Sequence, residues 1–246
     1  MKKSLISLAL AAAAGSFAMA GGDIAPVAPA PANNWDGFYM GIQAGYNWGD
    51  AEVDWIDNTD TADEIPYKGP AYDVDGTIAG IYGGYNWIFG EGWLLGVEGE
   101  INMVSGDDTQ STNYENEDDY PGEVKHNWDA SLRLRAGKVM GDFLPYVTGG
   151  VAWGGFHVKQ YAVYDENKIY FDKDMTLTGW TVGAGLEWSI SSNVHLRVQY
   201  RYTDYGDDSK RDLWKYENTA SPEGYFTDGT LDYNAHQVSV GLTFQF

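Results

Sequence analysis

Charged residues occur at every second position in several segments whose other residues are apolar or small. Because side chains alternate between the two faces of a strand, residues two apart point to the same side. The charged positions are Glu98, Glu100, Arg133, Arg135, Glu187, Arg197 and Arg201. Carboxylates and guanidiniums gathered in this way can neutralise one another as a hydrogen-bonded ion-pair network, or can line a narrow path for ions or protons.

The elements that must position these residues are strands with an apolar second face. In the last segment, apolar side chains occupy every even position from Val238 to Phe246, and polar residues or glycine lie between them. This alternation is typical of a strand that faces lipid on one side. The segments with this pattern are 38–48, 77–87, 93–103, 128–137, 146–156, 180–188, 194–203 and 237–246. Segment 146–156 fits either parity, so its facing stays open.

The connections between these segments are alternately short and long. Tight turns, with glycine, serine or asparagine at the reversal, are predicted at 88–92, 140–143 and 190–193. Long polar loops are predicted at 50–75, 106–124, 157–175 and 206–232. A soluble β-sandwich does not explain this rhythm, which outer-membrane barrels show. The sequence therefore predicts an all-β fold, an eight-stranded antiparallel up-and-down transmembrane β-barrel, over residues 35–246.

The interior of a barrel of this size is just filled by side chains. We therefore expect the inward charges to fill the lumen as an ion-pair network rather than to line a pore. Equal distances from the short turns predict which residues lie at the same level. The expected pairs are Glu98 with Arg135, Glu100 with Arg133, and Glu187 with Arg197 or His195.

The amino end has the three parts of a secretory signal peptide. Lys2 and Lys3 precede the apolar run 5–14, and a small-residue stretch ends at Ala20. The apolar run is too short for a membrane-spanning helix. We expect residues 1–20 to be a signal peptide cleaved after Ala20. Residues 21–34, rich in proline and alanine, are expected to form an extended, unpacked lead-in on the periplasmic side.

The composition excludes several classes of function. The formal net charge of −21 opposes nucleic-acid binding, because phosphates would be repelled. The chain has no cysteine, which excludes thiolate metal sites. No run of about eighteen apolar residues follows the amino-terminal segment, so no transmembrane helix is expected. No cofactor is expected either.

Most of the acid lies in the predicted long loops. Between 51 and 75 there are eight acidic residues and one lysine, and between 106 and 123 there are seven acidic residues and no basic one. Clustered carboxylates can bind Ca²⁺ or Mg²⁺, ions that also bridge lipopolysaccharide phosphates. The ordered spacing of a calcium-binding loop is absent. We therefore expect a solvated, repulsive surface and assign no metal site, and whether these loops bind divalent cations stays open.

Tryptophans lie near the ends of the predicted strands, on the outward face. They are Trp48, Trp87, Trp93, Trp128 and Trp188. Indole combines an apolar body with an N–H group that needs a polar partner, so it settles at the level of lipid headgroups. We expect an interfacial aromatic girdle rather than ordinary packing or a sugar-binding stack.

Hydrolytic catalysis would require histidine, serine and a carboxylate in one place. By parity His126 and His236 face outward, His157 begins a loop, and His195 lies near a short turn. None has an evident serine partner at the outer rim. No catalytic residue is assigned, and the protein is not expected to be an enzyme.

Four segments resemble a known family. They are 96–100 (GVEGE), 131–135 (SLRLR), 179–187 (GWTVGAGLE) and 197–206 (RVQYRYTDYG). They are similar to the small major outer-membrane proteins of alphaproteobacteria, a porin-family or surface-antigen group related to the OmpA transmembrane domain. The resemblance covers nearly all of the mature chain.

The resemblance implies a surface antigen with roles in envelope integrity and host interaction rather than catalysis. It also implies that the last strand is read by the barrel-assembly machinery, and Leu242, Phe244 and Phe246 match that signal. The other expected partners are outer-membrane lipid, lipopolysaccharide, and a host or extracellular ligand bound through the loops. The loops look longer and more acidic than in the family, so the ligand stays open.

Other functions are open at this point. One is a small-solute porin, and another is an adhesin or ligand-binding barrel that acts through its loops. A third, a lipid-acting enzyme, would depend on His126, His157 or His236. The sequence does not determine whether the barrel associates with other barrels.

Overall fold

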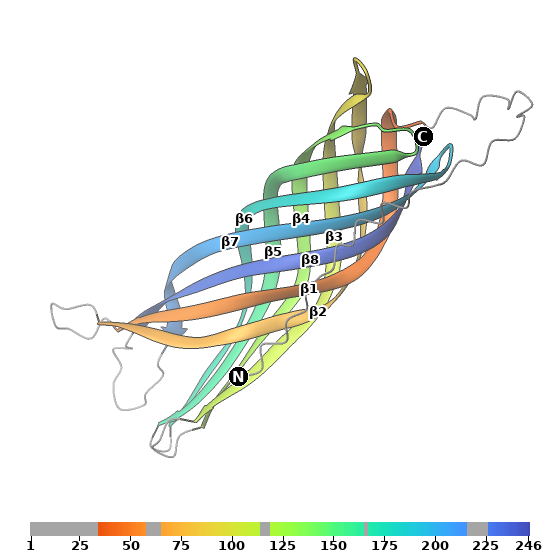
Figure 1. Cartoon of the computed structure of the whole chain (residues 1–246). Coiled ribbons are helices and arrows are strands. Elements are labelled where there is room, and N and C mark those ends of the chain that lie inside the picture. Colours follow the sequence, from red (N-terminus) through yellow and green to blue (C-terminus); the bar gives the residue numbers. More distant parts are fainter. Residues whose placement is uncertain (1–33, 58–64, 114–118, 165–166, 216–225) are drawn as a thin grey trace, which may run out of the picture. The chain divides into compact units, whose positions relative to one another are not determined.

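Antiparallel strands make up almost all of the described chain. The computed structural model describes residues 34–57, 65–113, 119–164, 167–215 and 226–246. The strands are β1 (Gly37–Asp57), β2 (Ile65–Phe89), β3 (Trp93–Asn113), β4 (Asp119–Lys138), β5 (Phe143–Tyr164), β6 (Asn167–Ser191), β7 (Val194–Lys215) and β8 (Phe226–Gln245). Each strand pairs with the next, and β8 pairs with β1, so the sheet closes into a barrel (Figure 1). The predicted fold class is confirmed.

Period-two alternation sorts the side chains between the two faces of the wall. In β8, Val240, Leu242 and Phe244 are 50%, 37% and 40% exposed, whereas Ser239 and Thr243, on the other face of the strand, are buried. The other strands repeat the alternation of exposed and buried side chains, with apolar side chains on the outer face and a mixture of polar and apolar ones inside. An outer wall of this kind is what a lipid environment requires.

The facing of β5, which the sequence leaves open, is defined in the structure. Val147 and Val151 are exposed on the outer wall, whereas Tyr146 and Thr148 are buried in the lumen. Both alternating sets of side chains in this segment include apolar residues. The set that includes Tyr146 faces the lumen.

The predicted long loops are wrong in extent, because most of their residues belong to strands. Within the predicted loop 50–75, for example, β1 continues to Asp57 and β2 begins at Ile65. A β-ladder is held by backbone groups, so pairing continues where the apolar alternation of the side chains ends. The barrel therefore has a short-turn end, at the turns before β3, β5 and β7, and a long-hairpin end. Segments 58–64, 114–118, 165–166 and 216–225 lie outside the described residues.

The predicted outward facing of His126 is also wrong. A bulge between His126 and Trp128 shifts the register of β4 against β5. One extra residue in a strand moves the side chains beyond it to the other face. Trp128 therefore stays on the outer wall, and His126 is buried in the lumen at 1% exposure.

The predicted signal peptide and nearly all of the lead-in lie outside the described residues, so both stay predictions. Asn34, the last lead-in residue, is not unpacked, because its backbone N–H donates to the Ser192 carbonyl at 3.2 Å. Among the described residues, no helix is long and apolar enough to cross a membrane.

The outer face of β4 predicts a loss of stability when a charge is introduced there. Leu132 is 51% exposed on the outer wall. We expect Leu132→Arg to lower the free energy of unfolding by about 2–4 kcal/mol, because a guanidinium at mid-depth must leave water for lipid. Urea unfolding of the protein in phospholipid vesicles measures this loss. Glu91→Arg in the exposed turn between β2 and β3 is the matched control, and an equal loss in the control would contradict the assigned faces.

Candidate functional site in the barrel lumen

The lumen contains a layer of ion pairs contributed by β3, β4, β6 and β7. All of the charged residues singled out in the sequence are at most 5% exposed: Glu98, Glu100, Arg133, Arg135, Glu187, Arg197 and Arg201. A buried charge is tolerated only when a partner and hydrogen bonds compensate for its lost hydration. In this layer each charge has an oppositely charged partner within 4 Å. Hydrogen bonds also connect the carboxylates of Glu98 and Glu100 to guanidiniums from β4 and β7.

Glu98 is the centre of the layer. Arg133 Nη2 lies 2.5 Å from its Oε1 atom, and Arg197 Nη1 lies 2.8 Å from its Oε2 atom. Arg135 Nη1 is 3.7 Å from the same Oε2 atom, and the Tyr39 hydroxyl donates to it at 2.7 Å. One carboxylate therefore joins three guanidiniums from two strands.

Glu100 extends the layer toward the long-hairpin end. It pairs with Arg133 and, at 2.9 Å, with Arg201. Arg201 also reaches Asp129 at 2.7 Å. Asn102 links the two acids, since its side-chain amide donates to Glu100 at 2.7 Å and to Asp129 at 2.9 Å.

Asp129 was not among the predicted network residues, although its parity places it on the inner face of β4. With it, the described layer contains four carboxylates and four guanidiniums. The carboxylates are Glu98, Glu100, Asp129 and Glu187, and the guanidiniums are Arg133, Arg135, Arg197 and Arg201. The charges of the described layer therefore balance.

Both predicted pairs between β3 and β4 are within ion-pair distance, Glu98 with Arg135 at 3.7 Å and Glu100 with Arg133, but their predicted levels are wrong by two residues. Glu98 lies opposite Arg133 rather than Arg135, and Glu100 lies opposite Ser131. The two short turns belong to different hairpins, so equal counts from them do not give equal heights. The pairing of Trp93 with Lys138 sets the register of β3 and β4 instead.

Glu187 also has a different partner from the predicted one. Its backbone lies opposite Arg197 in the β6–β7 ladder, but its carboxylate pairs with Arg135 at 2.8 Å. The Arg197 guanidinium is directed to Glu98. Partners in the lumen are therefore chosen across the barrel as well as along the ladder.

Tyrosine rings, which the sequence analysis did not single out, pack against the guanidiniums. The Arg135 guanidinium lies 3.9 Å from the centroid of the Tyr146 ring, and the Arg197 guanidinium lies 4.1 Å from that of Tyr82. This geometry allows cation–π attraction in a space that excludes water. The Tyr146 hydroxyl also donates to Gln199 at 2.9 Å.

Glycines on the inner face of the strands are the feature of the sequence that could have indicated these tyrosine rings. A β-carbon at Gly185 would lie 2.4 Å from the Tyr146 ring, and one at Gly41 would lie 2.3 Å from the Tyr82 ring. Glycine inside a strand marks a place where another group approaches the backbone closely. Here the approaching groups are the lumen tyrosines.

An apolar cluster closes the lumen on the long-hairpin side of the ion pairs. His126 stacks on Phe156 with ring centroids 4.6 Å apart, and Tyr233 meets Phe156 at 4.8 Å. Tyr205 lies against Tyr233 at 5.8 Å. Buried aliphatic side chains surround these rings: Ala51, Val74, Val124, Met175 and Leu177.

A second apolar cluster closes the short-turn end. Trp35, which precedes β1, is 3% exposed and stacks on His195 with centroids 4.0 Å apart. Leu94 and Leu144 complete this cluster. The Asn86 side-chain amide donates to the Trp35 carbonyl at 3.2 Å and holds the segment in place.

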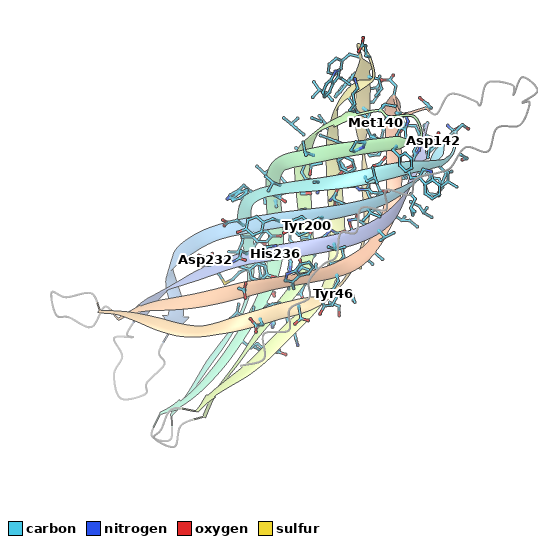
Figure 2. All side chains as sticks on the ribbon, in the orientation of Figure 1. Tyr46, Met140, Asp142, Tyr200, Asp232 and His236 are labelled. Atoms are coloured by element: carbon cyan, nitrogen blue, oxygen red, sulfur yellow. The ribbon has the colours of Figure 1, made fainter. Side chains whose placement is uncertain are left out.

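The outer wall carries aromatic side chains near both ends of its apolar band. All of the predicted girdle residues are 36–54% exposed: Trp48, Trp87, Trp93, Trp128 and Trp188. Trp180, at 49%, joins them. Figure 2 shows the side chains along this wall, with Tyr46, Tyr200 and His236 toward the long-hairpin end and Met140 and Asp142 at the short-turn end.

The residues of the predicted assembly signal share one face of β8 and the chain end. Leu242, Phe244 and Phe246 are 37%, 40% and 65% exposed on the outer wall. Their recognition by an assembly machinery stays a prediction.

The remaining histidines do not gather in one place. His157 lies within β5, not at a loop start, and its Nδ1 atom is 2.7 Å from Asp174. His236 Nδ1 is 2.7 Å from the Tyr200 hydroxyl on the outer wall. Within the part of the chain that the structure describes, no group of three potential metal ligands is arranged to hold a metal ion.

Comparison with known proteins decides the family. The family model described as the outer membrane protein beta-barrel domain matches residues 6–246. The chain belongs to this outer-membrane β-barrel family. The barrel is therefore located in the outer membrane, as predicted, with its apolar wall in contact with lipid.

Relatives of this family member come from alphaproteobacteria, as the sequence resemblance indicated. The 25 kDa outer-membrane immunogenic protein of Brucella abortus is 35% identical over 74% of this chain and 71% of its own length. The 22 kDa outer membrane protein of Rhizobium leguminosarum is 32% identical over 87% of this chain and 80% of its own length.

Among solved structures, the outer membrane protease OmpT from Escherichia coli superposes with a TM-score of 0.56. It is 8% identical, and the match covers 86% of this chain and 97% of that protein. Identity this low shows a shared barrel fold alone.

The central position of Glu98 gives a stability prediction. We expect Glu98→Gln to lower the free energy of unfolding by about 3–5 kcal/mol, because buried guanidiniums lose their counter-charge. Urea unfolding followed by tryptophan fluorescence measures the change. Glu91→Gln, in an exposed turn, should leave the stability unchanged. A loss below about 1 kcal/mol in Glu98→Gln, as for a surface pair, would contradict the assigned layer.

Proposed function

We propose that this outer-membrane barrel is a structural, surface-presenting protein that supports envelope integrity and does not conduct solutes. The observation that carries the proposal is the occupation of the lumen by buried side chains at successive levels. The Trp35 cluster, the ion-pair layer and the His126 cluster follow one another along the barrel.

The chemistry of these levels supports a closed barrel. A solute path needs polar groups that exchange partners with the solute, but the carboxylates of the layer already bind guanidiniums. The two clusters at the ends consist mainly of aromatic and aliphatic side chains, which offer a hydrated ion few polar groups in place of its water. Three such levels in series favour a structural role.

The long hairpins support a role in surface presentation. The two relatives named above are outer-membrane proteins, and the Brucella abortus protein is called immunogenic. The paired strands of this chain extend beyond the apolar band, and the sequence of these hairpins is rich in aspartate and glutamate. This composition supports a role for the hairpins as a display surface. We propose that a host or extracellular ligand, where there is one, binds to these hairpins.

Conductance tests the closed lumen. We expect purified barrel, reconstituted into planar bilayers, to give no stepwise current, because no continuous hydrated path crosses the three levels. Heat-modifiable gel migration of the same sample verifies that the barrel is folded. Reproducible unitary steps from folded protein would support a small-solute porin and overturn the proposal.

Hairpin trimming separates the structural role from surface binding. Asp54 and Lys68 are paired in the β1–β2 ladder, so an Asn-Gly turn can replace residues 55–67. In a deletion strain with raised detergent sensitivity, we expect this variant to restore resistance as well as the full chain does. Loss of binding to antisera or host cells by the trimmed protein would assign that binding to the hairpin. Failure of the folded, trimmed barrel to restore resistance would place the envelope role in the hairpin instead.

A further inference from the structure

We propose that the outer wall of β7, β8 and β1 binds one acylated sugar lipid of the outer leaflet. One acyl chain lies in a hollow at mid-depth, and the sugar hydroxyls lie against an aromatic and histidine cluster nearer the long hairpins. This site goes beyond the structural role and does not depend on whether the lumen conducts.

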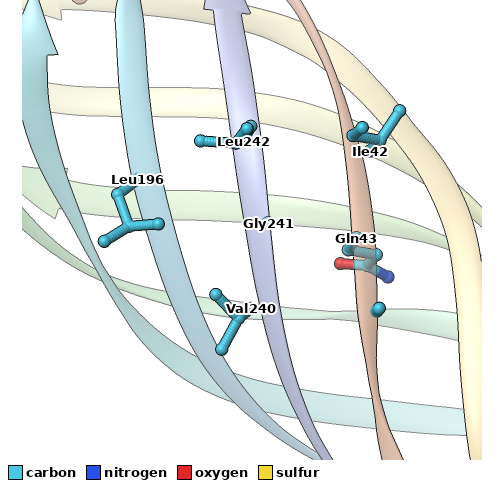
Figure 3. A pocket seen from close by; sticks show the side chains of 7 residues that line it. Ile42, Gln43, Leu196, Val240, Gly241 and Leu242 are labelled. Carbon is cyan, nitrogen blue, oxygen red and sulfur yellow. The ribbon is translucent and has the colours of Figure 1, made fainter.

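The hollow is a depression of about 260 Å³ in the apolar wall (Figure 3). Val240, Gly241 and Leu242 of β8 form the middle of the hollow. Ile42, Gln43 and Ala44 of β1 line one side, and Leu196 of β7 lines the other. Ala44 lies opposite Val240 in the ladder, and its methyl group leaves the space that a larger side chain would fill. A hollow without charges in a wall that contacts lipid fits an acyl chain.

The cluster lies on the same strands as the hollow. The Tyr200 hydroxyl is 2.7 Å from His236 Nδ1, and Trp48 stacks on His236 with centroids 5.6 Å apart and planes 15° apart. Tyr202 meets the same imidazole at 5.1 Å. Figure 2 shows Tyr200 and His236 on this part of the wall. Flat rings with hydroxyl and N–H groups at their edges suit the apolar faces and hydroxyls of a sugar.

The spacing of the two features matches one lipid. His236 and Val240 are four residues apart on β8, which corresponds to about 13 Å along the strand. One leaflet of the hydrocarbon core is about 15 Å thick, so a head group at the cluster places its chain at the hollow. At the short-turn end this wall presents Phe38, Phe244 and Phe246, whose rings offer no hydrogen-bonding group. The arrangement therefore favours a lipid of the outer leaflet.

Charge selects the part of the head group that is recognised. Asp50 and Asp232 are exposed beside the cluster, on β1 and β8. Carboxylates accept hydrogen bonds from hydroxyls but repel phosphates. We therefore expect recognition of the sugar and its chains rather than of phosphate.

Native mass spectrometry of the full mature barrel in detergent tests the site. Monophosphoryl lipid A is the probe, with phosphatidylethanolamine as the competing lipid class and diphosphoryl lipid A as the charge variant. We expect one retained monophosphoryl lipid A per barrel, retention at least equal to that of the diphosphoryl form, and no discrete phosphatidylethanolamine adduct.

Variants locate the lipid. Ala44→Phe fills the hollow and should weaken retention about tenfold, and His236→Phe should weaken it by removing the hydrogen-bonding edge. Ala136→Phe, on the outer face of β4, is the matched control and should bind as the wild type does. Heat-modifiable migration verifies folding of all three variants.

The outcomes separate the alternatives. Equal losses in Ala44→Phe and Ala136→Phe, or equal retention of phosphatidylethanolamine, would overturn the proposal. Tighter binding of the diphosphoryl form would overturn the assigned recognition of hydroxyls. Barrel dimers that Ala44→Phe abolishes would show that a second barrel occupies the face instead of a lipid.

Discussion

Compensation of charge inside a closed wall is the constraint on which the rest of the structure depends. A transmembrane barrel turns its apolar face outward, and the opposite face of every strand must then be accommodated in a narrow interior. Four carboxylates and four guanidiniums meet in the described lumen, nearly without solvent exposure. Each group is costly to bury alone, so the layer is stable only as a set.

The neighbouring features follow from this layer. Tyr82 and Tyr146 pack on the guanidiniums, and glycines paired with them on the neighbouring strands provide the space for their rings. Apolar clusters around Trp35 and His126 close the two sides, which keeps the effective dielectric low and the ion pairs strong. The filled lumen and the balanced charges of the ion-pair layer thus stabilise each other. Both favour a barrel with a structural and surface-presenting role.

The alternation in the sequence predicted the positions of the strands and the face on which most side chains lie. Alternation identified the strands and assigned Glu98, Arg133 and Arg197 to the inner face, because side-chain direction in a strand is a local property. Asp129 was missed as a partner although its parity was known, since pairing depends on distances across the lumen. The register of Glu98 against Arg133 is likewise set by how two hairpins meet, which no single segment encodes.

The other differences have local causes that a hydropathy pattern does not contain. The bulge beside His126 reverses the parity within β4, and no residue type in that segment requires it. The strands also extend beyond the segments with apolar alternation, because backbone pairing needs no apolar side chain. Trp35 lies between the predicted lead-in and the first predicted strand, and its stacking partner His195 is distant in the sequence.

A double-mutant cycle between Glu98 and Arg197 tests charge compensation inside the barrel most directly. The free energy of unfolding would be measured for the wild type, Glu98→Gln, Arg197→Gln and the double variant in the same vesicles. We expect a coupling energy near the upper end of the range for contacting groups, about 3 kcal/mol, because each charge loses its counter-charge in the single variants. Additive losses, with a coupling below about 0.5 kcal/mol, would show that the two charges do not compensate each other in the lumen.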